Sequence, residues 1–110
     1  MANTFKRYAS QNVGTSASTV GSYTVGASTQ TTLIGLTVAN KIANTIAVDV
    51  EHYDGATATL IVKNAPVPVG GSLVAVGGDQ KVVLETGDSI RVTSNYNNSA
   101  DVLMSLLEIT

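Results

Sequence analysis

The sequence predicts an all-β protein, a single antiparallel β-sandwich of jelly-roll-like form with an extended N-terminal arm. From residue 31 onward, short segments alternate between apolar and polar residues, which is the period of a half-buried strand. Turns rich in Gly, Asn and Pro separate these segments. Strands of ~5–6 residues at a spacing of ~8–12 residues are typical of sandwiches and small barrels. No segment requires a helix.

The predicted strands follow one another along residues 34–39, 46–53, 59–63, 72–76, 81–85, 89–93 and 101–109. The clearest is 46–53, where Ile46, Val48 and Val50 alternate with small or charged residues. Asp54-Gly55 after it is a strong turn signal. The expected separators are residues 64–68, 70–71, 77–79, 86–88 and 95–99.

The N-terminal part of the chain differs in composition from the rest. Residues 1–30 are predicted to form the arm and a Ser/Thr-rich lead strand, and residues 31–110 the sandwich domain. One strand is expected over 19–25, with Thr19, Gly21, Tyr23 and Val25 on one face. Residues 2–9 form a segment too short to bury its own aromatic side chains, so they are expected to contact another subunit. The predicted assembly contacts are Phe5, Lys6, Arg7 and Tyr8.

Composition excludes several classes of function. Charged residues make up 13% of the 110 residues, against ~25% in a typical domain, and the net charge is −2. The basic residues are scattered, so a nucleic-acid partner is not expected. The chain has no cysteine, no apolar run of membrane-spanning length and no secretory leader, which fits synthesis in a cytosol without membrane insertion. A surface this poor in charge favours burial between subunits. We therefore expect a homo-oligomer, with a trimer as one candidate.

No residue pattern predicts catalysis, a metal or a cofactor. His52 is the only histidine, and neither a nucleophile nor an orienting acid is evident near it in the sequence. Asp49 and Glu51 alternate with apolar residues on one strand, which is typical of its solvated face. The sequence therefore predicts a protein that is not an enzyme.

Tyr53 and Tyr96 border predicted turns and are the candidate ligand or partner surface. Exposed aromatic rings supply much of the contact area in many binding sites, and β-sandwiches often bind sugars. A host-glycan-binding module is accordingly the alternative from another functional class.

Several segments carry a resemblance to a known group of proteins. These segments are 34–40 (IGLTVAN), 46–50 (IAVDV), 60–73 (LIVKNAPVPVGGSL), 77–85 (GGDQKVVLE), 87–92 (GDSIRV) and 107–110 (LEIT), together with the opening MANTFK. In these segments the chain resembles small virion structural proteins of tailed bacteriophages, especially phages of marine bacteria.

The resemblance implies a particle component assembled in the host bacterial cytoplasm and located in the virion. It is similar to capsid decoration (cement) proteins or to small neck and tail accessory proteins, and it brings no catalytic residues. Capsid decoration is favoured, and a neck, tail or fibre component is the alternative. The implied partners are other copies of the chain and either the major capsid protein or neck and tail proteins.

Overall fold

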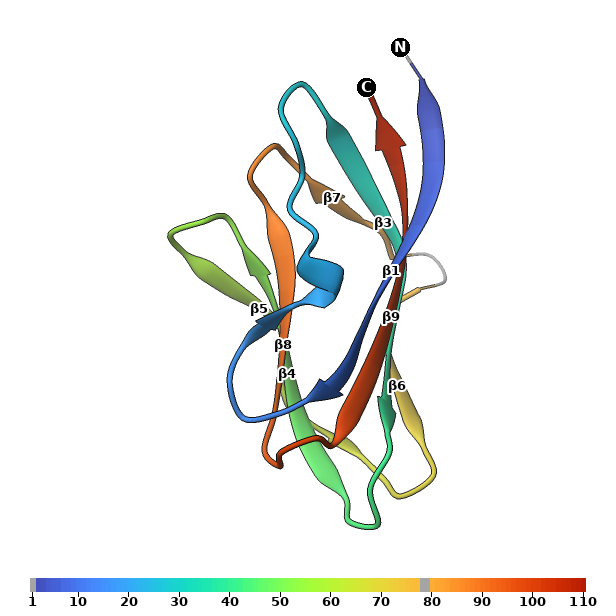
Figure 1. Cartoon of the computed structure of the whole chain (residues 1–110), viewed down its shortest axis with the longest axis vertical. Coiled ribbons are helices and arrows are strands. Elements are labelled where there is room, and N and C mark those ends of the chain that lie inside the picture. Colours follow the sequence, from blue (N-terminus) through green and yellow to red (C-terminus); the bar gives the residue numbers. More distant parts are fainter. Residues whose placement is uncertain (1, 78–79) are drawn as a thin grey trace.

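The computed structural model describes residues 2–77 and 80–110 and has the predicted all-β sandwich fold. Sheet A has the strand order β1-β9-β3-β6, and β7 also pairs with β3. Sheet B has the order β2-β8-β4-β5, and every pairing in both sheets is antiparallel (Figure 1). The strands are β1 (Asn3–Val13), β2 (Ser18–Thr19), β3 (Gln30–Asn40), β4 (Ile46–Tyr53), β5 (Ala58–Val67), β6 (Ser72–Val76), β7 (Val82–Leu84), β8 (Ser89–Ser94) and β9 (Ala100–Ile109).

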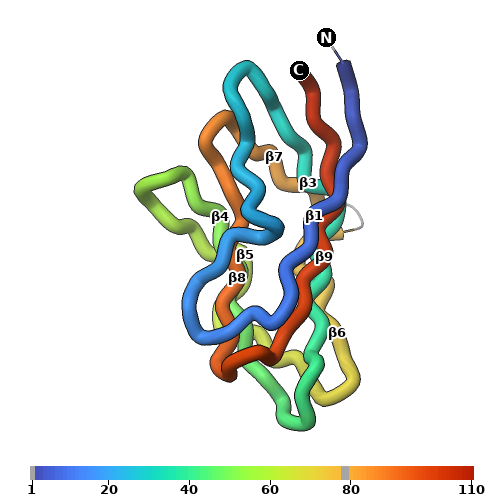
Figure 2. The backbone as a smooth tube through the Cα atoms, in the orientation of Figure 1, coloured from blue at the N-terminus to red at the C-terminus, as the bar shows by residue number. Residues whose placement is uncertain are grey.

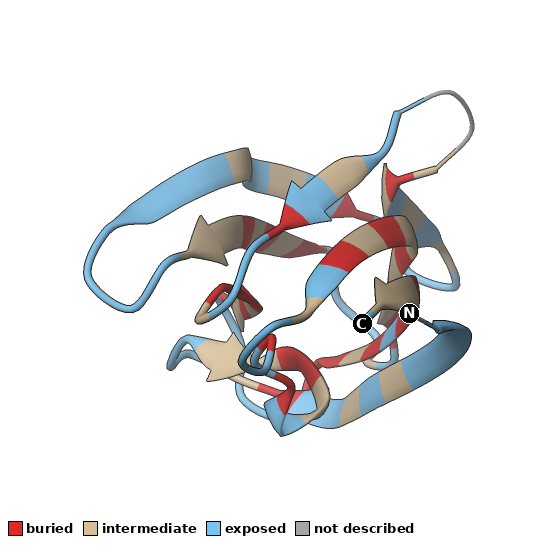
Figure 3. Cartoon of the chain, turned by 90° about the horizontal axis from the view of Figure 1, so that it is seen from above, coloured by how far each residue is buried: buried red, intermediate tan, exposed pale blue. Residues whose placement is uncertain are grey.

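The core lies between the two sheets because alternate residues of each strand point inward. Sheet B contributes Val48, Val50 and Ile90, and sheet A contributes Leu36 and Met104, all of them fully buried. Buried positions accordingly line the space between the layers, while the outer positions are exposed or half-buried (Figure 3). The β4–β5 hairpin projects from this body at one side (Figure 2).

The N-terminal segment is extended, as predicted, but it lies within the chain's own sheet. β1 pairs with β9 in one unbroken register from Asn3↔Ile109 to Ser10↔Val102. The chain then crosses to sheet B, where β2 pairs with β8. Residues 1–30 therefore supply an edge strand to each of the two sheets that residues 31–110 build.

The predicted strand over 19–25 is wrong beyond its first residue. β2 ends at Thr19, and Val20–Ser22 form a 3-10 turn, η1. Gly21 has φ +58° and Ser22 has φ +55°, so the backbone turns in the left-handed region that extended strands do not use. The turn brings Val20 and Tyr23 together into the core rather than onto alternate faces.

The separator predicted at 64–68 is also wrong, since β5 continues to Val67. Asn64 adopts φ +51°, and the β4–β5 register shifts there, which marks a bulge rather than a strand end. Pro66 pairs with Ala47, and it lies on β5, an edge strand of sheet B. A proline is tolerated there because the side of an edge strand that faces solvent makes no hydrogen bonds to another strand. Turns at Gly55, Gly70 and Gly87 lie where they were predicted, with positive φ at each glycine. In the predicted Gly77-Gly78-Asp79 turn, residues 78 and 79 lie outside the described residues.

Candidate interaction surface

The outer face of sheet A carries several exposed apolar side chains, and the pairing of its strands shows how they are arranged. Residues directly opposite one another in neighbouring strands share a face, so each set of partners forms a row across the sheet. The upper row is Phe5, Leu107, Thr32 and Val83. The lower row is Ala9, Leu103, Thr37 and Val74.

These rows carry exposed apolar side chains at both edges and in the middle. Phe5 is 76% exposed on β1, Val83 is 65% exposed on β7 and Val74 is 63% exposed on β6. Leu103, on the central strand β9, is 51% exposed and borders a mainly apolar hollow together with Ala9, Thr37 and Ala39. A single exposed leucine needs no explanation, but a set gathered on one sheet face indicates a contact surface.

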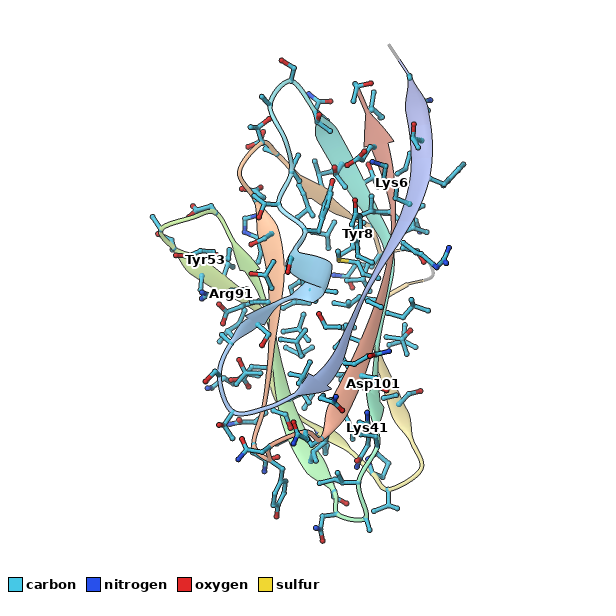
Figure 4. The ribbon with its side chains drawn as sticks, viewed as in Figure 1. Lys6, Tyr8, Lys41, Tyr53, Arg91 and Asp101 are labelled. Carbon is cyan, nitrogen blue, oxygen red and sulfur yellow. The ribbon has the colours of Figure 1, made fainter. Side chains whose placement is uncertain are left out.

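The four residues predicted as arm contacts divide between the two faces of sheet A. Phe5 and Arg7 lie opposite Leu107 and Ser105 and point outward. Lys6 points inward, where its Nζ lies 2.9 Å from Oε1 of Glu108 (Figure 4). This hydrogen bond and the carboxylate charge raise the pKa of Lys6. Two of the four residues are therefore free to contact another molecule, and whether they do so stays a prediction.

Tyr8 is the other inward member, and it joins a polar cluster at the end of the core. Its ring stacks on the ring of Tyr23, with centroids 4.4 Å apart. The Tyr23 hydroxyl donates to Glu108 at 2.7 Å and lies 2.8 Å from the Thr31 hydroxyl oxygen. Burial of the Tyr23 phenol raises its pKa to about 12, and the hydrogen bond from Tyr23 lowers the pKa of Glu108. The cluster fastens β1 and the segment after η1 to β9.

Tyr53 and Tyr96 lie at opposite ends of β8 and do not share a surface. Tyr53 pairs with Ser89 at the start of β8, whereas Tyr96 follows the end of the strand at Ser94. The guanidinium of Arg91 covers the Tyr53 ring at 3.7 Å from its centroid (Figure 4). The Tyr53 hydroxyl is also engaged, donating to the Gly55 carbonyl at 3.1 Å. Tyr96 is 44% exposed and stands alone at its turn.

The ionisable residues considered for catalysis each have a local structural partner. His52 Nε2 lies 2.9 Å from Oδ2 of Asp88, and that oxygen also accepts the Glu85 N–H. Glu51 is paired with Arg91, and Oδ1 of Asp49 accepts the Asn64 N–H at 2.7 Å. Within residues 2–77 and 80–110, no group of three metal-ligating side chains comes together.

Two short strands of sheet A carry a sequence signal for the apolar face. β6 reads Ser-Leu-Val-Ala-Val and β7 reads Val-Val-Leu, so both strands are apolar on both faces. A strand with only one buried face should alternate between apolar and polar residues. Continuous apolar runs therefore indicate a second covered face, and the pairing of both strands with β3 shows that Val74 and Val83 lie on it.

Comparison with known proteins gives little similarity. No protein-family model matches the chain, and no curated protein matches it. One solved structure, the crystal structure of a pentameric capsid protein isolated from metagenomic phage sequences, is similar with a TM-score of 0.45 and 22% identity. The match covers 92% of this chain, which spans 59% of that protein's length. In the described part of the chain, no helix is long and apolar enough to cross a membrane.

Proposed function

We propose that this chain is a structural protein of a bacteriophage particle, a decoration protein that binds the capsid surface through the outer face of sheet A. The observation that carries the proposal is the apolar hollow beside Leu103, on the outer face of sheet A. Its partner is the major capsid protein, and other copies of the chain lie beside it. The sequence resemblance to small virion proteins supplies the identity of the particle.

The chemistry of the face suits a protein partner. Ala39 and Ala9 border Leu103 with small apolar side chains, whose burial leaves no side-chain hydrogen bond unmade. The charged residue at the rim, Asp101, is already paired with Lys41 at 3.1 Å. An apolar centre with paired charges at its rim is the usual composition of a protein–protein interface.

The glycan-binding alternative has less support. Sugar-binding platforms present an open aromatic face, whereas the ring of Tyr53 is covered by Arg91 and its hydroxyl is engaged by Gly55. Tyr96 is exposed, but among the described residues it has no second aromatic ring beside it, since Tyr53 is at the far end of β8.

The test is to image intact particles of a phage that encodes this chain at subnanometre resolution and to locate its copies. Many copies spread over the capsid lattice, with the outer face of sheet A toward the shell, are expected. Copies confined to the tail axis or the fibres would overturn decoration and favour the neck or tail alternative.

A variant pair adds residue-level detail to the imaging. Leu103→Asp places a charge in the hollow and should strongly reduce occupancy on the particle. Leu60→Asp changes an equally exposed leucine on β5 in the other sheet and should leave occupancy unchanged. Equal occupancy for both variants would show that the outer face of sheet A is not the contact.

A further inference from the structure

β1 forms an edge of sheet A that is open to solvent. Within the described residues it pairs only with β9, and residues Asn3 to Arg7 are all exposed (Figure 1). The β1–β9 register is regular along this stretch, since its one shift lies between Ser10 and Val13. Free strand edges are templates for adding a strand from another chain.

The hydrogen-bond pattern identifies the backbone groups of β1 that are free. Ala2 and Thr110 exchange two backbone hydrogen bonds, with N···O distances of 3.1 and 3.0 Å. In an antiparallel ladder, such a pair alternates with a pair whose N–H and C=O groups point away from one another. Along the regular register that follows, the N–H and C=O groups of Asn3, Phe5 and Arg7 therefore point to the free edge.

The same three residues carry their side chains on the outer face of sheet A. The Phe5 ring is 76% exposed there, and the Arg7 guanidinium has no ion-pair partner among the described residues. Covering a large apolar ring is favourable, so a strand added at this edge would gain both backbone hydrogen bonds and apolar burial.

A second copy of β1 fits this edge because β1 is complementary to itself in one antiparallel register. With a two-fold axis at Phe5, the Phe5 residues of two copies lie opposite one another. Arg7 of each copy then lies opposite Asn3 of the other, and Lys6 lies opposite Thr4. All the free N–H and C=O groups of Asn3, Phe5 and Arg7 find partners in this register. An axis at Thr4 would instead leave the Phe5 ring opposite the polar Asn3.

Charge disfavours the registers centred further along β1. An axis at Lys6 or at Arg7 would set two like charges directly opposite one another, which destabilises a strand pair. With the axis at Phe5, the Arg7 guanidinium faces the Asn3 amide and is within diagonal reach of the Phe5 ring of the second copy, which it can contact as a cation–π pair. Lys6 is directed inward and is paired with Glu108 at 2.9 Å, so it brings no unpaired charge to the contact.

We infer that two copies of this chain associate through β1, antiparallel about a two-fold axis at Phe5, so that sheet A continues from one copy into the other. The contact uses the same residues on both partners. Side chains opposite one another in an antiparallel pair share a face, so the outer faces of the two copies join into one surface. Residues 3–7 of each copy bury less than the ~1,200 Å² of a stable interface, so the dimer is weak and forms at high protein concentration.

Single cysteines test the contact directly, because the natural chain has no cysteine. Position 5 lies on the axis, where the Cα atoms of a hydrogen-bonded pair are about 5.5 Å apart, within the range of a disulfide. Oxidised at ~1 mM, Phe5→Cys should form a covalent homodimer at least about tenfold faster than Leu60→Cys. Leu60 is 50% exposed on β5 of the other sheet, so Leu60→Cys gives the rate of random collision.

A mixture of two variants tests the register. Asn3→Cys mixed with Arg7→Cys should give heterodimers, identified by mass, because these two positions lie opposite one another. Either variant alone should cross-link as slowly as Leu60→Cys. Its two cysteines would be four residues apart along the paired strands, or about 13 Å, which is too far for a disulfide.

Sedimentation measures the contact without a cross-link. Phe5→Asp sets two carboxylates opposite one another and should weaken dimerisation at least about tenfold. Because the Phe5 side chain is exposed, the fold should tolerate this substitution. Leu60→Asp should dimerise like the natural chain.

Three results would overturn the inference. The first is cross-linking of Phe5→Cys no faster than that of Leu60→Cys. The second is cross-linking of Asn3→Cys or Arg7→Cys alone as fast as that of their mixture. The third is equal dimerisation of Phe5→Asp and Leu60→Asp. These solution measurements concern copies of the chain alone, so they succeed or fail independently of the imaging of particles.

Discussion

The Tyr23 hydroxyl donates a 2.7 Å hydrogen bond to Oε2 of Glu108, a residue 85 positions further along the chain. Through this bond the segment after η1 is fixed to the last strand of the fold. The other carboxylate oxygen of Glu108 pairs with Lys6 of β1, so three segments distant in sequence meet at one carboxylate. Glu108 therefore adds side-chain contacts to the β1–β9 pairing that holds the N-terminal strand in sheet A.

Tyr23→Phe is expected to destabilise the fold by ~1–3 kcal/mol. The substitution keeps the ring stacked on Tyr8 but leaves Thr31 and Glu108 without their shared partner. Urea denaturation of the two proteins measures the difference. The control is Tyr96→Phe, whose hydroxyl belongs to an exposed ring, and its effect should stay within ~0.5 kcal/mol. Equal effects of the two variants would contradict the structural role of Glu108.

Stability should fall in acid partly because Glu108 becomes protonated. Its pKa in the folded chain is below the ordinary value of 4.5, first because of the hydrogen bond from Tyr23 and then because of Lys6. A carboxylate whose pKa is lowered by folding stabilises the folded chain fully above pH 4.5. This stabilisation is lost as the pH falls through the pKa that Glu108 has in the folded chain. Lys6 is 43% exposed, so added salt should screen its share.

Unfolding measured at a series of pH values below neutrality checks this dependence. Glu108→Gln should show a shallower loss of stability below pH 4.5 than the natural chain, since glutamine does not titrate. Parallel curves for the two proteins would mean that other carboxylates account for the acid sensitivity.

Gly21→Ala is expected to loosen the contact between η1 and β1. A Cβ at this position would lie 2.6 Å from Cβ of Tyr8, so the backbone of one segment has to move. The left-handed φ adds ~1 kcal/mol, for a total of at least ~2 kcal/mol by thermal or urea denaturation. Gly26→Ala is the matched control, because the nearest atom to its Cβ is 3.9 Å away. That variant should be neutral or slightly stabilising.

The backbone conformation of Asn64 at the bulge leads us to expect different effects from two substitutions. Asn64 has φ +51°, which glycine adopts without cost and a β-branched residue strongly resists. Asn64→Gly should therefore change stability by a few tenths of a kcal/mol, whereas Asn64→Val should lose ~1–2 kcal/mol. Both variants retain the backbone N–H that donates to Asp49, so denaturation isolates the conformational term. Equal losses of stability in the two variants would mean that the destabilisation comes from removing the asparagine side chain rather than from the backbone conformation.

These positions also show where sequence reasoning succeeded and where it failed. Period-two alternation is a local property, and it identified strands such as 46–53 and 101–109 because each buries one face. At 19–25 the same alternation was present, but Gly21 and Ser22 adopt left-handed conformations, and Gly21 packs closely against Tyr8, which is far away in the sequence. At 64–68 two prolines suggested a break, but only Pro68 lies beyond β5, and Pro66 is compatible with β5 because β5 is an edge strand.

The candidate surface was less predictable than the fold. The sequence singled out Phe5 and Arg7, which are exposed, together with Lys6 and Tyr8, whose partners Glu108 and Tyr23 lie far along the chain. Which side of a strand faces out depends on register with its neighbours, and register is not a local property. Val74 and Val83 join the surface for the same reason, since only their pairing with β3 places them at its edge.

In alkali, Tyr23 should make the chain lose stability in a defined range of pH. Burial of its phenol, the largest cause, raises the pKa of Tyr23 in the folded chain from 10.0 to about 12. A raised pKa contributes stability that is fully present below pH 10.0 and declines as the pH rises through about 12, because the unfolded chain ionises first. Ultraviolet absorbance titration of the natural chain minus that of Tyr23→Phe should give a step centred near pH 12. A step centred near 10.0 would mean that the Tyr23 phenol is open to solvent, and the anchoring of β1 through Glu108 would then be wrong.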